Sequence, residues 1–376
     1  MSLAVPLTPL PTASPALTAA GAPAAPVALP PARRAWLPVT LLAVLLAVLV
    51  GAILASAVTG QMPISPAEVF SSVAAKLGFG EAQAEAPYAE AALWTVRFPR
   101  VALALLVGAC LAVAGVLMQG IFGNPLAEPG VIGVSSGAAV GACTVIVFGL
   151  SWLGPWTMVA AAFAGGLGAT MLAYRTARRG GRTEVVTLVL TGVAVNAVCG
   201  AAIALMVFLG DTQAREQIVF WQLGSLNGAR WVEVAVVAPV AVVGIAVAVS
   251  LSRQLDLLSL GERSARHLGV DVERLRRIAI LVVALLTSAA VAFGGIISFV
   301  GLVVPHLVRM AIGPGHRWLL VISGVGGAAL LLVADLLART LVTYAELPIG
   351  MLTALVGGPF FFWLIRRSSH RAGGWA

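Results

Sequence analysis

The chain has 376 residues, of which 60% are hydrophobic and only 10% are charged. A soluble domain of this size cannot hide so much apolar surface from water, so the composition excludes one. The formal net charge of +8 does not indicate nucleic-acid binding, because the positive residues are segregated by loop, as orientation in a membrane requires.

Ten hydrophobic runs follow one another along the chain. Such runs predict membrane-spanning helices, because about 20 residues at ~1.5 Å per residue cross the ~30 Å hydrocarbon core. They lack the alternation that β-barrel strands require. The predicted fold class is an all-α polytopic membrane protein with about ten transmembrane helices. The predicted spans are 36–58, 99–121, 131–150, 155–174, 185–209, 232–251, 278–292, 296–312, 318–336 and 349–365.

The two ends of the chain lie outside the membrane domain, which we expect over 36–367. Residues 1–35 are rich in alanine and proline and carry no charge before Arg33 and Arg34, which predicts a disordered cytoplasmic tail. The basic pair and the apolar run after it imitate a signal peptide, but that run is too long, so an uncleaved first helix is expected. Residues 368–376 are expected to form a second cytoplasmic tail.

Lysine and arginine set the orientation of the spans. With the N-terminus inside, all but six of the 23 fall on the inner side, which satisfies the positive-inside rule. An even number of spans then returns the C-terminus to the cytoplasm. The six on the outer side are Lys76, Arg97, Arg100, Arg215, Arg230 and Arg339.

The segment 59–96 is the longest predicted outer loop. Arg97 and Arg100 follow it at the outer rim, and Pro99 between them predicts the start of a helix, because its missing N–H costs nothing in a first turn. Two interpretations of the arginines stay open. They either anchor the rim by reaching the interface, or they dock an acidic partner.

Several polar residues lie within or beside the spans. Gln119, near the inner end of the second span, either bonds a neighbouring helix or lines a pathway. Asp335 and Arg339 are four residues apart in the ninth span, where pairing is expected, since a lone charge in the bilayer costs ~3 kcal/mol. Around 294–301, two short apolar pieces interrupted by glycine predict a broken helix, which is tolerated only where protein or water satisfies the backbone.

The outer segment 211–226 mixes charged and aromatic residues, which is typical of a short interfacial helix, here at the mouth of a cavity. Arg215 lies four residues after Asp211, so the two side chains can pair on one helix face.

A basic inner stretch, 260–277, carries five arginines between two apolar runs. Within it, Gly261, Ala265 and Gly269 recur every four residues, so on a helix they share one face. A helix with a small-residue face can press closely against another surface. The alternative interpretation is an ordinary cytoplasmic loop.

Signatures of catalysis and of an energy source are missing. The single lysine, Lys76, is preceded by two alanines, so a G-x-x-x-x-G-K-[ST] phosphate loop is impossible. The sequence predicts no metal site, no cofactor and no enzyme. The spans also lack the carboxylates of a proton relay. A pathway without its own energy source needs a partner, although a self-sufficient secondary transporter and a membrane-embedded enzyme remain as alternatives.

Several motifs occur in a fixed order along the chain. They are Arg97-x-Pro-Arg100, Gly108-Ala109-x-Leu-Ala112-x-x-Gly115-x-x-x-Gln119, Asn124-Pro-Leu-Ala127-x-Pro129-x-x-x-Gly133-Val134-x-x-Gly137-Ala138, Trp221-x-x-Gly224-Ser225-Leu226, Leu260-Gly261-x-x-x-Ala265-Arg266-x-Leu268-Gly269-Val270, Phe299-Val300-Gly301-Leu302-x-x-Pro305-His306-x-x-Arg309, Ala334-Asp335-x-x-Ala338-Arg339 and Glu346-Leu347-Pro348-x-Gly350. In these motifs the chain resembles the permease subunits of bacterial ABC importers for vitamin B12, ferric siderophores and heme.

The resemblance implies a type II ABC importer permease fold in the bacterial inner membrane. It implies a homodimer with a pathway at its two-fold axis, two ATPase subunits on the inner face and a periplasmic substrate-binding protein. The predicted docking residues for that protein are Arg97, Arg100 and Arg339. The coupling helices that would contact the ATPase are expected at 259–270, with Leu260, Gly261, Arg263, Ala265, Arg266, Leu268 and Gly269 as their coupling residues.

Two stretches, 130–137 and Gln213-Ala-Arg215 ahead of Phe220-Trp221, look most like the heme importers. Heme carries two propionates, which Arg215 can pair with through charge-assisted hydrogen bonds. Arg215 and Gln119 are therefore the predicted pathway residues. Ferric siderophore and vitamin B12 remain as alternative substrates.

Overall fold

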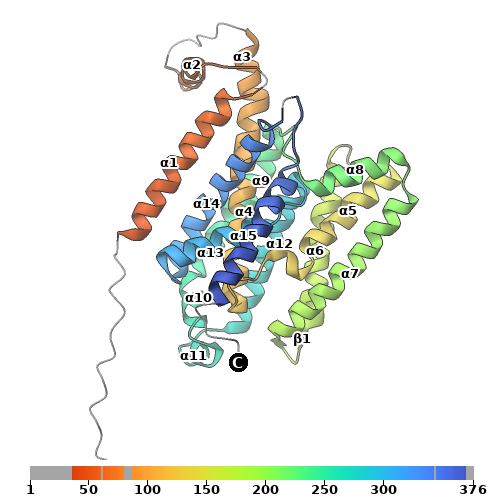
Figure 1. Ribbon diagram of the computed structural model, residues 1–376. Helices are drawn as coiled ribbons and strands as arrows, with labels where there is room; N and C mark the ends of the chain where they lie inside the picture. The colour runs from red at the N-terminus through yellow and green to blue at the C-terminus, as the bar shows by residue number, and fades with distance from the viewer. Residues whose placement is uncertain (1–35, 61, 80–86, 343, 370–376) are drawn as a thin grey trace, which may run out of the picture. The chain divides into compact units, whose positions relative to one another are not determined.

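Apolar runs fold as helices in a bilayer because every backbone polar group must be satisfied within the segment. The computed structural model describes residues 36–60, 62–79, 87–342 and 344–369, all within one unit, Ala35–Ala376. Each of the ten predicted spans coincides with an apolar helix there (Figure 1), which confirms the all-α polytopic fold. They are α1 (Leu37–Val58), α4 (Phe98–Phe122), α5 (Val134–Phe148), α6 (Trp156–Ala177), α7 (Val185–Leu209), α9 (Trp231–Ser250), α12 (Val272–Gly294), α13 (Val300–Ile312), α14 (His316–Ala338) and α15 (Ile349–Ser369).

Shorter elements lie at the two ends of these helices. We call the ends the α8 end and the α11 end, after a helix at each. The segment 59–96, predicted as a loop, contains helical structure, and the basic segment between α6 and α7 forms a two-stranded antiparallel turn. The short elements are α2 (Pro66–Lys76), α3 (Pro87–Ala92), η1 (Leu93–Arg97), η2 (Pro129–Ile132), β1 (Arg178–Arg179), β2 (Arg182–Thr183), α8 (Thr212–Leu223), α10 (Ser252–Leu258) and α11 (Glu262–His267).

The helix containing Pro99 begins earlier than predicted. Helix α3 runs into η1, a π-helical turn, which continues without a break into α4. Pro99 occupies the second position of α4, where it cannot donate a hydrogen bond to the preceding turn. A wider π turn directly before a proline absorbs this missing bond. Proline therefore marks a local change in helix type here, and not the start of the helix.

Helix α4 is the centre of the bundle. In the most apolar 18-residue stretch of this helix 78% of the residues are buried, against 11% in that of α7. Helix α4 contacts α9, α12, α13 and α14 (Figure 1). Glycine makes this packing possible. A Cβ at Gly115 would lie 1.8 Å from the Gly301 carbonyl oxygen, and one at Gly108 would lie 2.3 Å from that of Gly327. Small residues at these positions therefore let the helices approach closely.

The expected break between the seventh and eighth spans is confirmed. Helix α12 ends at Gly294, and α13 begins only at Val300. A backbone group freed by the break is bonded to the segment just after α8, where Ser225 N donates to Gly294 O at 3.0 Å. At the same junction, Ile349 N donates to Gly224 O at 3.0 Å. Protein therefore supplies the hydrogen bonds that lipid cannot.

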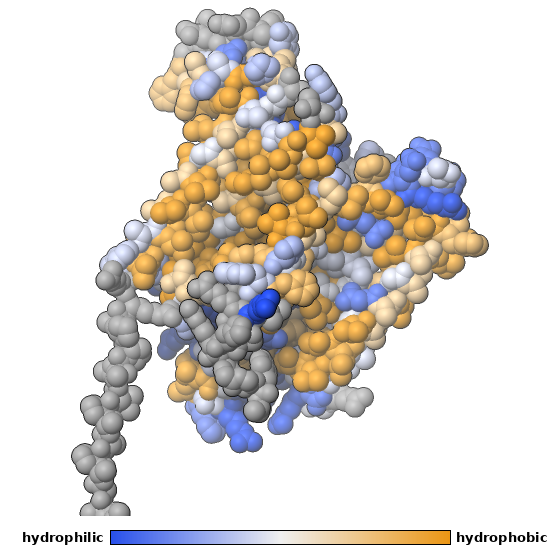
Figure 2. Space-filling model, in the orientation of Figure 1, coloured by the Kyte–Doolittle hydropathy of each residue, from blue (hydrophilic) through white to orange (hydrophobic). Residues whose placement is uncertain are grey.

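Surface hydropathy follows the same plan. Figure 2 shows apolar residues over the middle of the visible face, with hydrophilic residues gathered over α8 and around α11. This pattern fits a bilayer that crosses the bundle between its two ends. The predicted N-terminal tail, 1–35, lies outside the described residues, as do residues 370–376 of the second tail.

Candidate functional site

The predicted coupling segment is a six-residue helix, α11, between two glycine turns. Gly261 and Gly269 lie outside the helix with φ of +100° and +84°, a backbone region that favours glycine. Ala265 is fully buried against its own chain. The expectation that these three residues share one helix face is therefore not met, because the helix is too short to include the glycines.

Other residues of the segment form its exposed surface. Leu260 and Leu268 are 63% and 57% exposed, although both are large and apolar. Arg263 and Arg266 are exposed between them. Apolar side chains flanked by positive charge are what a partner groove with an acidic rim would contact. We call these four residues the coupling surface.

Ion pairs tie α11 to the start of α12. Glu262 pairs with Arg266 at 2.5 Å and with Arg276 at 2.9 Å. Partial burial would raise the pKa of Glu262, but the positive charges of Arg276 and Arg266 outweigh burial and hold this pKa below its usual value. Arg276 also donates to Thr183 O at 3.1 Å, and Thr183 N donates to Glu273 at 2.9 Å. The α6–α7 turn and α11 are thereby joined to one helix.

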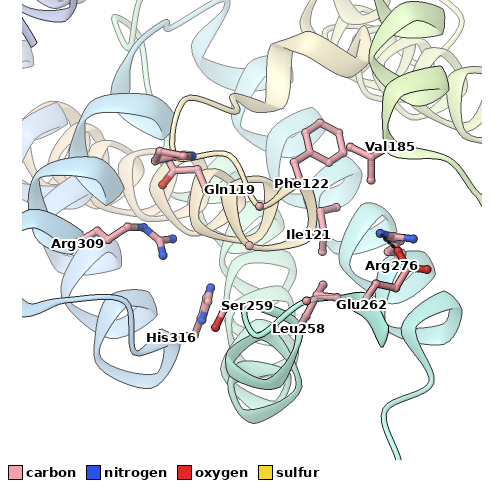
Figure 3. A pocket seen from close by; sticks show the side chains of 14 residues that line it. Gln119, Ile121, Phe122, Val185, Leu258, Ser259, Glu262, Arg276, Arg309 and His316 are labelled. Atoms are coloured by element: carbon pink, nitrogen blue, oxygen red, sulfur yellow. Dashed lines mark hydrogen bonds and ion pairs between the residues drawn. The ribbon is translucent and has the colours of Figure 1, made fainter. Parts of the chain in front are cut away.

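A cavity of about 390 Å³ lies between α11 and the end of α4 (Figure 3). Arg309 and His316 point into one side of it, below Gln119, while Arg276 and Glu262 face each other at the other side. Gln119 is buried, and its Nε2 donates to the Leu302 carbonyl oxygen at 3.3 Å. Of its two interpretations, bonding to a neighbouring helix is thus observed, and the pathway role stays a prediction.

The three predicted docking arginines come together at the α8 end, around a cavity of about 770 Å³. Arg97 donates to the carbonyls of Ala57 and Met62, and Arg339 donates to Ser56 O at 2.8 Å. Their partners lie in and just after the last turn of α1, where helix carbonyls lack intrahelical donors. Arg97 and Arg339 therefore cap the C-terminus of α1.

Arg100 is the centre of a buried ion cluster. It pairs with Asp335, whose side chain is fully buried, at 2.9 Å and with Glu346 at 3.0 Å. The expected pairing of Asp335 with Arg339 is also present, at a longer 3.8 Å. The sequence predicted that second contact from its spacing of four residues, but nothing in it signals the partnership of α4 with the α14–α15 loop.

The helix predicted within 211–226 is confirmed as α8, but the pairing of Arg215 with Asp211 is wrong. Asp211 accepts a hydrogen bond from Ala214 N at 2.7 Å and caps the helix. Arg215 instead donates through Nε to Val207 O, at the end of α7, at 2.9 Å. Its side chain is exposed at the turn between α7 and α8.

Sequence reasoning missed one contact at the α11 end. Asp256 of α10 accepts hydrogen bonds from the backbone N and from Nδ1 of His316, at 2.8 and 2.7 Å. The two residues are 60 positions apart, so no helical spacing connects them. His316 is buried, so its ring needs a hydrogen-bond partner, but this burial is seen only in the fold.

In the described parts of the chain, ten apolar helices, a broken helix pair and charged clusters at both ends define a multi-pass membrane protein. The model of the FecCD transport family matches residues 42–367, so the chain belongs to that family. It is a permease of the metal-chelate, vitamin B12 and heme type of ABC importer.

Known relatives agree with this assignment. The hemin transport system permease protein HmuU of Yersinia pestis is 46% identical over 290 residues, which cover 75% of this chain and 85% of the relative. The cobalamin import system permease protein BtuC of Halobacterium salinarum is 43% identical over 80% of this chain and 79% of its own. A solved structure described as an inward-facing metal-chelate type ABC transporter is 33% identical, with a TM-score of 0.77, and covers 87% of this chain and 99% of the solved one.

Proposed function

We propose that the protein is the permease of an ATP-driven importer that moves heme from the periplasm to the cytoplasm. The observation that carries the proposal is the 46% identity to a hemin transport permease over 85% of that protein. The stretches 130–137 and 213–221 support it, because they look most like those of heme importers. Vitamin B12 is the second candidate, favoured by 43% identity to a cobalamin import permease.

Arg215 is proposed to lie on the heme route. Its side chain is exposed at the α8 end, which is the predicted outer side. The bonds to the carbonyls of Val207 and Phe208 hold Nε and Nη2. Nη1 is thus left to meet a propionate through a charge-assisted hydrogen bond.

An ATPase partner is proposed for the coupling surface at the α11 end. That surface combines exposed Leu260 and Leu268 with two arginines, which suits a groove with an acidic rim. The surface occurs twice in the proposed homodimer, so two ATPase subunits are expected. We propose that the permease itself lies in the bacterial inner membrane with both of its termini in the cytoplasm.

The arginine cluster at the α8 end is proposed to dock a periplasmic substrate-binding protein. Arg100 and Arg339 pair with the carboxylates of Asp335 and Glu346, and Arg97 beside them leaves one net positive charge. Because these side chains are engaged within the chain, they would act mainly through their field on an acidic partner. Binding should then weaken as salt is raised, and an affinity that is independent of salt would contradict this role.

The substrate is tested by reconstituting the complete transporter in liposomes and measuring ATP hydrolysis with each candidate chelate. We expect heme with its binding protein to stimulate hydrolysis, and cobalamin and ferric siderophore to leave it at the basal rate. The Arg215→Ala variant should lose stimulation by heme, while Arg230→Ala, another exposed arginine at the α8 end, keeps it. Stimulation by cobalamin alone would overturn the heme assignment in favour of vitamin B12.

A further inference from the structure

At the α11 end, the carboxylate of Asp256 joins the segment that leads into α11 to the start of α14. Asp256 lies in α10, three residues before Ser259, and the chain then passes through Gly261 into α11. Asp256 Oδ1 accepts two hydrogen bonds from His316, the first residue of α14, at 2.8 Å from the backbone N and 2.7 Å from Nδ1. The coupling segment is thus fastened to the turn between α13 and α14.

The chemistry of this contact is directional. A carboxylate oxygen only accepts, so Nδ1 of His316 must carry the proton. The His316 side chain is 2% exposed, whereas that of Asp256 is 45% exposed, so the bond reaches from the surface into the packed bundle. The charge of Asp256 also attracts Arg309 of α13, whose Nε and Nη2 are buried with no hydrogen-bond partner in the described part of the chain.

The coupling segment therefore has two attachments. The first is the pair of Glu262 with Arg276, at 2.9 Å, which leads into α12. The second is Asp256, which leads into α13 and α14. Helices α12 and α13 are separated by the break at 295–299, so a push on α12 alone does not have to move α13.

We propose that Asp256 is a positioning residue that transmits movement of the coupling segment to the α13–α14 turn through His316. This inference rests on the proposed function, because it requires that an ATPase moves α11. Asp256 contacts neither the partner nor the substrate in this account. Its loss should separate ATP hydrolysis from transport and leave assembly intact.

The test compares substrate moved per ATP hydrolysed in liposomes that contain the complete transporter. Asp256→Ala removes the acceptor and should lower this ratio about fivefold or more, the lower end of couplings between protein sites. His316→Gln should do the same, because its amide replaces Nε2 and not Nδ1. His316→Asn keeps a donor on an atom attached to Cγ, as Nδ1 is, and should stay within about twofold of the wild type.

A control removes a nearby charge without touching His316. Asp271 caps α12 by accepting from Arg274 N at 3.0 Å, and Asn caps a helix equally well, so Asp271→Asn should behave as the wild type. Ratios for Asp256→Ala and His316→Gln that remain within twofold of the wild type would overturn the inference. So would an equal loss in His316→Asn. A wild-type chain that fails to bind the ATPase would instead overturn the proposed function.

Discussion

Arg100 shows why a charged side chain can be both buried and stable in a membrane protein. Its guanidinium lies between Asp335, at 2.9 Å, and Glu346, at 3.0 Å, and all of its positive charge is balanced by acceptors from one loop and one helix. An ion pair in a low-dielectric interior is stable only with such close geometry. Arg100 lies 235 and 246 positions before Asp335 and Glu346, so the cluster fixes the position of α4 against α14 and the loop before α15.

The Arg100→Gln variant should be destabilised by about 3–5 kcal/mol, because it leaves Asp335 buried without its main partner. Thermal unfolding in detergent, followed by tryptophan fluorescence, measures the change. Arg230→Gln is the control, since Arg230 is 55% exposed and pairs with Glu233 at the surface, and its loss should cost less than about 1 kcal/mol. If Arg100→Gln unfolds at the same temperature as the wild type, Arg100 does not stabilise the fold.

Residue types and short spacings predicted part of these sites. The sequence placed Arg97, Arg100 and Arg339 at one rim, because the charge distribution oriented the spans. It predicted the contact of Asp335 with Arg339 from their spacing on one helix. It failed for Asp211 with Arg215, because a side chain at a helix start bonds the free backbone N–H groups first. Contacts over 60 or more residues, such as Asp256 with His316, have no local signal at all.

At the scale of elements, the ten apolar helices were predictable because the bilayer allows so few backbone solutions. The π turn before Pro99 and the length of α11 were not. Gly261, Ala265 and Gly269 have helical spacing, yet the two glycines end the helix on either side, because their backbone conformations lie at positive φ. Periodicity therefore predicted a shared helix face that the glycine turns do not allow, while the coupling role of the segment stays a prediction.

The coupling surface is a better place than Ala265 to test docking by mutation, because its leucines are exposed whereas Ala265 is buried. Leu268→Glu places a charge at a 57% exposed position without disturbing the core, so the fold should survive. Binding of the ATPase should weaken about tenfold, which corresponds to a loss of roughly 1.4 kcal/mol. Co-purification at several concentrations measures this. Leu341→Glu, a 58% exposed leucine at the α8 end, is the matched control and should retain the ATPase. Equal retention by both variants would place the docking surface elsewhere.

At the scale of the whole molecule, α12 connects the coupling segment with the far side of the bundle. Its 23 residues extend about 34 Å as one helix, from the ion pairs around Arg276 to the glycine junction at Gly294. There Gly294 O accepts a hydrogen bond from Ser225 N, just after α8, and Gly224 O in the same segment accepts one from Ile349 N at the start of α15. A force applied at α11 thus has a continuous path to the α8 end, while α13 and α14 receive it through Asp256.

We propose that this chain is a passive gate, moved by ATP hydrolysis in a partner. The most direct measurement is heme accumulation in liposomes, with the permease alone under imposed proton or sodium gradients, and then with its ATPase, binding protein and ATP. We predict accumulation only in the complete, ATP-supplied system. Sustained accumulation by the permease alone would contradict the claim and establish a secondary transporter.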